Sequence, residues 1–299
     1  MNNAHIVENK KILKRYKMNC RNKGLTKESI KAIVGNDLRL FINFIGNKPL
    51  SKVSHLDVQD FLLLCSEERS NGDEAVARKF NSINMLFKTL IKQETLNIKN
   101  SLDKLEKPKV RKKYRGHLTM EEYERLLKYL DASNETNKLR NLALISFFYS
   151  SGCRLTEVYQ QNIENLDFTG RRFKVVGKGA KERICIFSRD TSKRLKKYLD
   201  TRADDIPALF ISRQKNRLSK KAIQDVIKNT GKRAGIKKNL HPHLLRHTRA
   251  QNLLAKGASL ETIQRLLGHE SIATTQIYAR MNMDSVQNEI ANIDGDIGL

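Results

Sequence analysis

Residues 241–251 read HPHLLRHTRAQ. Three histidines and two arginines gather within nine residues of this stretch. Pro242 suits the first position of a helix, because the backbone N–H that proline lacks would have no partner there. A helix that begins at Pro242 carries His243, Arg246 and His247 on one side and leucines on the other. The stretch therefore predicts an amphipathic helix whose polar side faces a cleft.

Three kinds of site fit that polar side: a zinc site, a solvated basic face, and half of a centre for phosphate chemistry. Zinc would take His241, His243 and His247 as ligands. Arg246 stands among them, however, and a metal cation beside a guanidinium is unfavourable. Histidine is a poor choice for solubility alone. We therefore expect no metal and favour phosphate chemistry.

The charge of the whole chain agrees with a polyanionic partner. Its 299 residues include 57 Lys and Arg against 32 Asp and Glu, a net charge of +25. Residues 1–116 hold 25 of the basic and 12 of the acidic side chains, so both halves are basic. A lysine-rich genome would explain the lysines but not arginines within histidine motifs. Nucleic acid is the expected partner.

Cysteine spacing and hydropathy indicate the cellular compartment. Cys20, Cys65, Cys153 and Cys185 lie far apart in the sequence and form no C-x-x-C pair, so we expect neither a disulfide framework nor structural zinc. No stretch approaches the ~20 apolar residues of a membrane span, and the N-terminus shows no signal peptide. A cytoplasmic protein without a membrane partner is expected.

The N-terminal third predicts a small helical bundle over residues 1–106. Apolar residues recur at helical spacing in 26–46 and again around VQDFLLLC (58–65), and Asp73 suits the cap of a third helix. The segment EKPKVRKKYRGHL (106–118) has no apolar periodicity and many cations. We therefore interpret residues 107–118 as an exposed basic linker.

Residues 119–282 predict a second domain of mixed α/β character. Thr119 and Glu122 fit a capping box, and LALISFFY (142–149) fits a buried helix. Three β-rich segments separated by turns predict a small antiparallel three-stranded sheet; they lie near 163–168, 172–176 and 183–187. The chain reads as helical from Ser192, with helix ends at Gly257 and Gly268 and N-caps at Ser259 and Ser271. The expected fold class is mainly α, in two domains.

Three further segments hold side chains that suit phosphate chemistry. SGCRLTEV (151–158) puts Arg154 just after a glycine, near a helix start, and GKGAKER (177–183) puts Lys178 in a turn between two strands. LGHESIATTQIYARM (267–281) puts His269 after a helix end and Tyr278 nine residues later. Each alone is weak, because it also fits a surface ion pair, a hairpin lysine or a core aromatic.

Together and in this order, the segments resemble the tyrosine recombinase family, which includes phage integrases, Xer recombinases and mobile-element resolvases. The matching patterns are G-x-R at 152–154, G-K-G-x-K-x-R at 177–183, H-x-L-R-H-T at 243–248, L-G-H-x-S at 267–271 and T-x-x-Y-A at 275–279. The first domain is similar to the family's SAM-like core-binding domain in size, helical content and basic linker. It carries no diagnostic motif.

The resemblance implies a site-specific DNA recombinase, and the chemistry of each side chain suits its implied role. Arg154 and Arg246 would clamp a phosphate, because guanidinium stays protonated and offers a planar fork. Tyr278 would attack phosphorus, with His243 as its base. Lys178 would protonate the leaving 5′-oxygen, and His269 would stabilise the developing charge. His241, His247 and Arg249 receive no role.

The implied product is a 3′-phosphotyrosyl link with a free 5′-hydroxyl, exchanged through a Holliday junction without ATP, metal or cofactor. The partners would be double-stranded DNA with a specific core site and further copies of the chain in a synaptic tetramer; accessory proteins are not indicated. We expect no additional N-terminal arm-binding domain, which favours a Xer-like recombinase or a mobile-element resolvase. Chromosome-dimer or cointegrate resolution and integration or excision of a mobile element all fit, in a bacterial or archaeal cell.

Two other classes of protein fit part of the sequence. A type IB topoisomerase shares the tyrosine chemistry but relaxes one duplex, and an architectural DNA-binding protein would need neither Tyr278 nor Lys178. Residues 283–299 have four acidic and no basic side chains, with Val286, Ile290 and Ile293 at helical spacing. This C-terminal tail is expected to contact another protomer.

Overall fold

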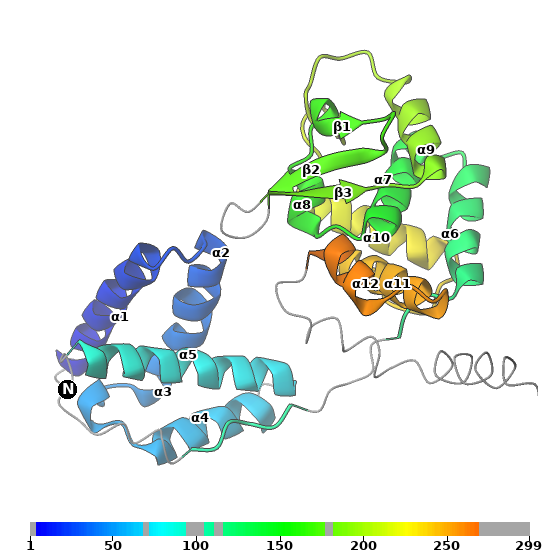
Figure 1. Ribbon diagram of the computed structural model, residues 1–299. Coiled ribbons are helices and arrows are strands. Elements are labelled where there is room, and N and C mark those ends of the chain that lie inside the picture. Colours follow the sequence, from blue (N-terminus) through cyan, green and yellow to red (C-terminus); the bar gives the residue numbers. More distant parts are fainter. Residues whose placement is uncertain (1–3, 68–71, 94–104, 111–115, 177–181, 269–299) are drawn as a thin grey trace, which may run out of the picture. The chain divides into compact units, whose positions relative to one another are not determined.

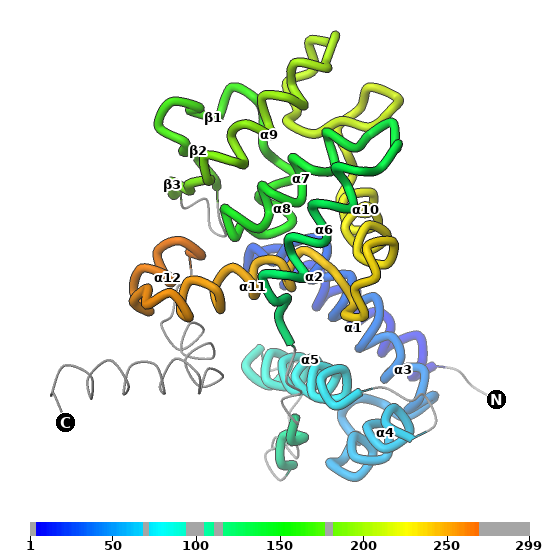
Figure 2. Tube along the Cα trace, turned by 90° about the vertical axis from the view of Figure 1, so that its right-hand side faces the viewer, coloured from blue at the N-terminus to red at the C-terminus, as the bar shows by residue number. Residues whose placement is uncertain are grey.

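The computed structural model describes residues 4–67, 72–93, 105–110, 116–176 and 182–268 (Figures 1 and 2). The chain divides into two compact units, Met1–Tyr114 and Arg115–Leu299, each with a hydrophobic core of its own. Within the described ranges, no helix is both long and apolar enough to cross a membrane.

The first unit is a helical bundle, as predicted. Its elements are α1 (Ala4–Asn22), α2 (Lys27–Ile30), a π-helical segment (Lys31–Leu38), α3 (Arg39–Ile45), a 3₁₀ turn (Leu50–Lys52), α4 (His55–Glu67) and α5 (Asp73–Lys92). The predicted helix at 26–46 is confirmed as the continuous run from α2 to α3, and Thr26 caps it by accepting a hydrogen bond from the Ser29 N–H. Asp73 does not cap α5 as predicted: Gly72 holds the cap position and Asp73 is the first helical residue, where its charge complements the helix dipole.

Helix α1 was not predicted from the sequence. Its buried residues are Asn9, Leu13, Tyr16 and Cys20, which follow helical spacing. The stripe includes the polar Asn9, and apolar residues such as Val7 and Met18 lie outside it on the exposed side, so the helical pattern is faint. Asn9 is buried because its side chain binds the loop before α4: it donates to Lys48 O at 2.8 Å and accepts from Leu50 N at 3.2 Å.

The second unit combines helices with a small sheet, which confirms the predicted class. Its elements are α6 (Met120–Ala132), α7 (Lys138–Ser151), α8 (Leu155–Tyr159), a 3₁₀ turn (Ile163–Asn165), β1 (Leu166–Asp167), β2 (Arg172–Val176), β3 (Glu182–Ile186), α9 (Arg189–Leu199), α10 (Lys220–Arg233), α11 (Pro242–Ala255) and α12 (Leu260–Leu267). The predicted capping box at Thr119 and Glu122 is present. Helix α9 begins three residues before Ser192, because Ser188 caps it by accepting from the Thr191 N–H.

The sheet is antiparallel in the order β1-β2-β3, as predicted. Phe173 pairs with Cys185, and both face the core, while Lys174 and its partner Ile184 are on the solvent side. The first strand is shorter than predicted, because residues 163–165 turn as a 3₁₀ helix before β1.

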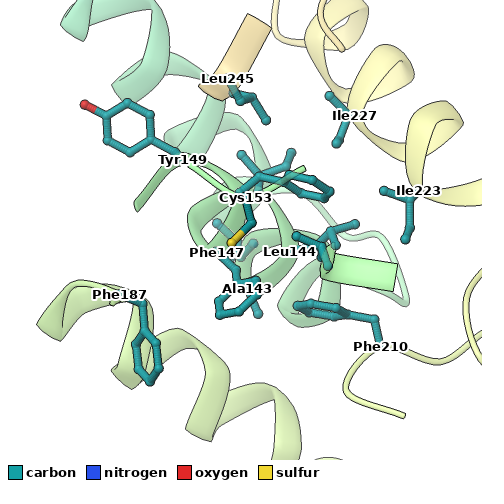
Figure 3. Close-up of a cluster of buried hydrophobic side chains, with 14 of the residues drawn as sticks. Ala143, Leu144, Phe147, Tyr149, Cys153, Phe187, Phe210, Ile223, Ile227 and Leu245 are labelled. Carbon is teal, nitrogen blue, oxygen red and sulfur yellow. The ribbon is translucent and has the colours of Figure 1, made fainter. Parts of the chain in front are cut away.

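Helix α7 forms the centre of the second core, as its apolar sequence predicted. All residues from Arg140 to Ser151 are buried, and the Phe147 ring contacts the rings of Phe173, Phe187 and Phe210. Figure 3 shows Phe147, Phe187 and Phe210 within this core. Leu118, expected at the end of the linker, is also fully buried in this core, and its N–H donates to the Thr248 hydroxyl at 3.0 Å. The second core thus begins before the first helix of the unit.

Candidate active site

The first part of the site is the turn between α7 and α8. Gly152 ends α7 with φ 61°, a conformation that favours glycine, and a Cβ there would come within 2.7 Å of Leu267 on α12. Arg154 follows at the N-cap of α8, as predicted, and its N–H donates to Glu157 Oε2 at 2.7 Å. The close approach of α12 is therefore possible because residue 152 has no side chain.

Arg246 is held beneath this turn by main-chain carbonyls. Helix α11 begins at Pro242 as predicted, with His241 as the N-cap whose ring accepts from the Leu244 N–H. Arg246 is only 5% exposed; its Nη1 donates to Gly152 O at 2.6 Å and its Nη2 to Leu267 O at 2.9 Å. The predicted polar side of α11 therefore includes a guanidinium that joins the ends of α7 and α12.

Arg154 reaches the same end of α12 from the other direction. Its Nη2 donates to Gly268 O at 3.2 Å, and its side chain remains 38% exposed. Arg154 and Arg246, which lie 92 residues apart in the sequence, thus bind the consecutive carbonyls of Leu267 and Gly268. The fold therefore brings the two arginines to the same helix end, while their predicted role as a phosphate clamp remains a prediction.

Glu157 holds the arginines in place and was not singled out from the sequence. Its side chain is 3% exposed and accepts from Arg154 Nη1 at 3.0 Å and from Arg183 at 2.8 and 2.9 Å. Burial raises the pKa of this carboxyl, but the hydrogen bonds from Arg183 and Arg154 outweigh it and keep the pKa below its usual range. The i, i+3 spacing from Arg154 was the available signal.

Arg183 connects β3 to the same cluster, and it too was not assigned a role from the sequence. Gly268 ends α12 with φ 64°, and a Cβ there would lie 2.5 Å from Arg183 Nε. Burial lowers the pKa of Arg183, but the Glu157 carboxylate more than compensates and raises it. Arg183, the last residue of the 177–183 motif, can therefore keep this position only because residue 268 has no side chain.

The histidines of α11 separate into different surroundings. His243 is exposed on the first turn, with its ring centroid 6.5 Å from that of His241. His247 lies 6.4 Å from the ring of His117, and Arg249 lies over the Tyr149 ring at 5.6 Å. Among the residues that the structure describes, no three His, Cys, Asp or Glu side chains are grouped as a metal site would require.

Three of the predicted site residues lie outside the described residues: Lys178, His269 and Tyr278. Lys178 belongs to the segment between β2 and β3, and His269 directly follows Gly268. Their roles remain predictions. The N-cap predicted at Ser271 and the C-terminal tail also fall outside the described ranges.

The described part of the site can bind a phosphate. Three guanidinium groups, from Arg154, Arg183 and Arg246, gather around one carboxylate, that of Glu157, and around carbonyl oxygens. The positive charge therefore exceeds the negative charge among these four side chains. A phosphate group would neutralise the excess and accept hydrogen bonds in the geometry that guanidinium favours.

Comparison with known proteins supports the family resemblance seen in the sequence motifs. The family model described as the phage integrase family matches residues 117–285. Tyrosine recombinase XerC of Pseudomonas entomophila is 34% identical over 253 residues, which cover 82% of this chain and 83% of that protein. Tyrosine recombinase XerD of Bifidobacterium longum is 28% identical over 84% of this chain and 86% of its own.

Solved structures share the fold. The Tn1549 transposon integrase in complex with transposon right end DNA gives a TM-score of 0.77 at 18% identity, covering 95% of this chain and 99% of that one. The structure of XerH site-specific recombinase bound to a palindromic difH substrate gives a TM-score of 0.72 at 21% identity. The match covers 93% of this chain and 83% of that one.

Proposed function

Because the chain belongs to the phage integrase family and is a site-specific tyrosine recombinase, we propose that Arg154, Arg246, His243, Lys178, His269 and Tyr278 are its catalytic residues. They cut one DNA strand at a time through a 3′-phosphotyrosyl intermediate and rejoin it to a partner strand.

One observation supports the assignment of the arginines above all others. Arg154 and Arg246 come from separate motifs, yet they bind adjacent carbonyls at the end of α12, one residue before His269. Two guanidinium groups that converge on one helix end form the clamp that a phosphate with two non-bridging oxygens requires. Main-chain carbonyls bind both guanidinium groups, and Glu157, which also binds Arg154, adds a single negative charge, so the positive charge of Arg154 and Arg246 still exceeds it and attracts an anion.

The chemistry requires neither ATP nor metal. The Tyr278 oxygen forms a bond to phosphorus as the bond from phosphorus to the 5′-oxygen breaks, and the tyrosine proton passes to His243. Lys178 gives a proton to the leaving 5′-oxygen. Arg154 and Arg246 stabilise the negative charge that grows on the non-bridging oxygens, and His269 donates a hydrogen bond there. A 5′-hydroxyl from the partner strand reverses these steps.

In this proposal, different segments of the chain bind DNA and catalyse the reaction. Residues 1–106 bind the core site, 107–118 form the basic linker, 119–282 carry out catalysis and 283–299 contact a neighbouring protomer. The basic charge of both halves supports a double-stranded DNA partner, and the structurally similar Tn1549 integrase and XerH are bound to transposon-end DNA and to a difH substrate. Recombination joins two duplexes, so four copies assemble on them. Relatives named XerC and XerD favour a Xer-like task, on DNA in the cytoplasm.

The decisive test is the variant Tyr278→Phe. The core site is first identified by sequencing the DNA that the protein binds in cells, and the variant is then assayed on a nicked duplex that carries this site. The variant lacks only the hydroxyl, so it should bind DNA like the wild type while the covalent adduct seen on a denaturing gel disappears. Tyr129→Phe, which removes another hydroxyl of the second unit, is the matched control and should keep the adduct.

Two outcomes would contradict the proposal. An adduct formed by Tyr278→Phe would exclude this nucleophile, and the absence of an adduct with wild type would favour an architectural DNA-binding protein. Strand-exchanged products from two sites distinguish a recombinase from a type IB topoisomerase, which traps DNA covalently but relaxes a single duplex.

A further inference from the structure

Two cysteines that are 32 positions apart in the sequence meet beside the arginine cluster. The Cys153 thiol donates to Cys185 Sγ at a sulfur–sulfur distance of 3.6 Å. Both residues are 1% exposed, and Cys153 lies among the packed side chains of the second core (Figure 3). All four cysteines of the chain are free thiols. Sequence separation argued against a disulfide, but the fold brings this one pair into contact.

The two cysteines belong to the segments that hold the arginines. Cys153 lies between Gly152, whose carbonyl accepts from Arg246, and Arg154. Cys185 lies on β3, two residues after Arg183, which binds Glu157 with both of its Nη atoms. A covalent bond between the sulfurs would therefore join the α7–α8 turn directly to β3.

The environment of the pair distinguishes the two thiols. The hydrogen bond from Cys153 and the nearby charge of Arg183 lower the pKa of Cys185, although burial opposes this. The hydrogen bond to Cys185 and burial raise the pKa of Cys153. Cys185 is thus the thiol that ionises first, and the thiolate is the form that reacts with oxidants.

We propose that Cys153 and Cys185 form a reversible oxidation site, and that their disulfide displaces the Arg154 turn and slows DNA cleavage. The effect on cleavage rests on the proposed function of Arg154, whereas the formation of the disulfide does not.

The oxidant is a peroxide of small size, such as hydrogen peroxide, which enters when the core opens locally. The Cys185 thiolate attacks one peroxide oxygen and becomes a sulfenic acid, and the other oxygen leaves as hydroxide and takes up a proton to become water. Cys153 sulfur then attacks the sulfenic sulfur, its proton leaves with the hydroxyl, and a second water forms. Two thiols lose two electrons in total, and the peroxide gains them. An external dithiol reverses the reaction.

The size of the expected effect follows from the geometry. A disulfide requires a sulfur–sulfur distance of about 2.05 Å, so the pair must close from 3.6 Å. We expect the backbone of the turn to take up part of this movement, because both side chains are packed in the core and have little room to rotate. A displacement of about 1 Å in a catalytic centre lowers rates by about 100-fold.

The test uses the full chain, treated with hydrogen peroxide and then alkylated at its remaining thiols. Mass spectrometry of a proteolytic digest should reveal a peptide linked through Cys153 and Cys185. The same sample should cleave a nicked core site about 100-fold more slowly and bind it with unchanged affinity. Dithiothreitol should restore the rate.

Single-cysteine variants provide the controls. Cys185→Ala and, independently, Cys153→Ala should cleave DNA and resist peroxide, while Cys65→Ala keeps the pair and should remain sensitive. Two variants of the pair are used because one still provides the control if the other does not fold.

Three results would overturn the inference: a folded, peroxide-treated protein without the linked peptide, a linked form that cleaves as fast as the dithiol form, or pair variants as sensitive as the wild type. A reduced wild type that makes no covalent adduct would instead refute the proposed function, since the linked peptide is measured without any activity.

Discussion

Both units bury one carboxylate and pair it with arginine, but the two clusters differ in charge balance. In the first unit Asp37 lies in the π-helical segment and accepts from Arg78 through Nε and Nη2, both at 3.0 Å, and from Ser82 at 2.9 Å. In the second unit Glu157 accepts from Arg154 and Arg183, and Arg246 stands beside them on carbonyls.

The difference distinguishes a charge-balanced cluster in the first unit from a cluster with excess positive charge in the second, to which the proposed function assigns catalysis. The ion pair of Asp37 and Arg78 is neutral and joins α5 to the π-helical segment, which is what a structural pair requires. The cluster around Glu157 holds three guanidinium groups for one carboxylate, and one of them, that of Arg154, is partly exposed. Concentrating like charges is costly, and in the proposed function the DNA phosphate is the anion that would offset this cost.

The largest effect that would test this comparison concerns the arginines. Arg154→Lys and Arg246→Lys keep a positive charge but lose the planar fork, so single-turnover cleavage at saturating DNA should fall by roughly 10²–10³-fold. Arg78→Lys makes the same change in the first unit and should leave that rate unchanged. Near-normal cleavage by both site variants would mean that the second cluster is structural as well.

The second largest effect should come from neutralising the two buried carboxylates. Glu157→Gln leaves the largely buried Arg183 without its carboxylate and should cost about 3–5 kcal/mol of unfolding free energy in urea. Asp37→Asn should cost less, because the Arg78 side chain is 54% exposed and stays solvated. Only Glu157→Gln should also slow cleavage by the folded protein, because Arg154 loses its anchor. Equal cleavage by the two variants would remove the distinction between the clusters.

The response to acid should depend on Glu157. Its pKa is lowered in the folded protein, so its contribution to stability is complete above the unfolded value of about 4.3. That contribution is lost as pH falls through the folded pKa, with a slope of at most about 1.4 kcal/mol per pH unit. Urea denaturation between about pH 5 and pH 3 should show a smaller slope for Glu157→Gln than for wild type. Identical slopes would contradict the role of the carboxylate.

The smallest effects concern two glycines with similar backbone. Gly24 has φ 73° and open space around the position that a Cβ would take, whereas Gly268 has φ 64° and Arg183 Nε at 2.5 Å from that position. Gly24→Ala should cost about 1 kcal/mol of unfolding free energy for its left-handed conformation. Gly268→Ala should cost about 1 kcal/mol more and slow cleavage, since Arg183 must move. Equal losses of unfolding free energy in the two variants would show that the Arg183 side chain can move away without cost.

Local patterns predicted most of the second unit and little of the first helix. The capping box at Thr119, the buried helix at 142–149 and the three-stranded sheet follow from spacing and apolar runs that each lie within a few residues. Helix α1 was missed because its buried side includes Asn9, which is stabilised by a loop about forty residues away. Asp73 was misplaced by one residue because glycine can also occupy an N-cap.

The sequence by itself determined the family, the helical and mixed classes of the two domains, and the choice of Arg154 and Arg246 as site residues, because ordered motifs and short-range periodicity are properties of the chain alone. Only the tertiary structure decided that Glu157 binds Arg154 and Arg183, that main-chain carbonyls hold Arg246, that His241 caps α11, and that Cys153 meets Cys185. The arginine cluster and the cysteine pair join segments up to about a hundred residues apart, and packing of the core around α7, rather than any local pattern, brings such segments together.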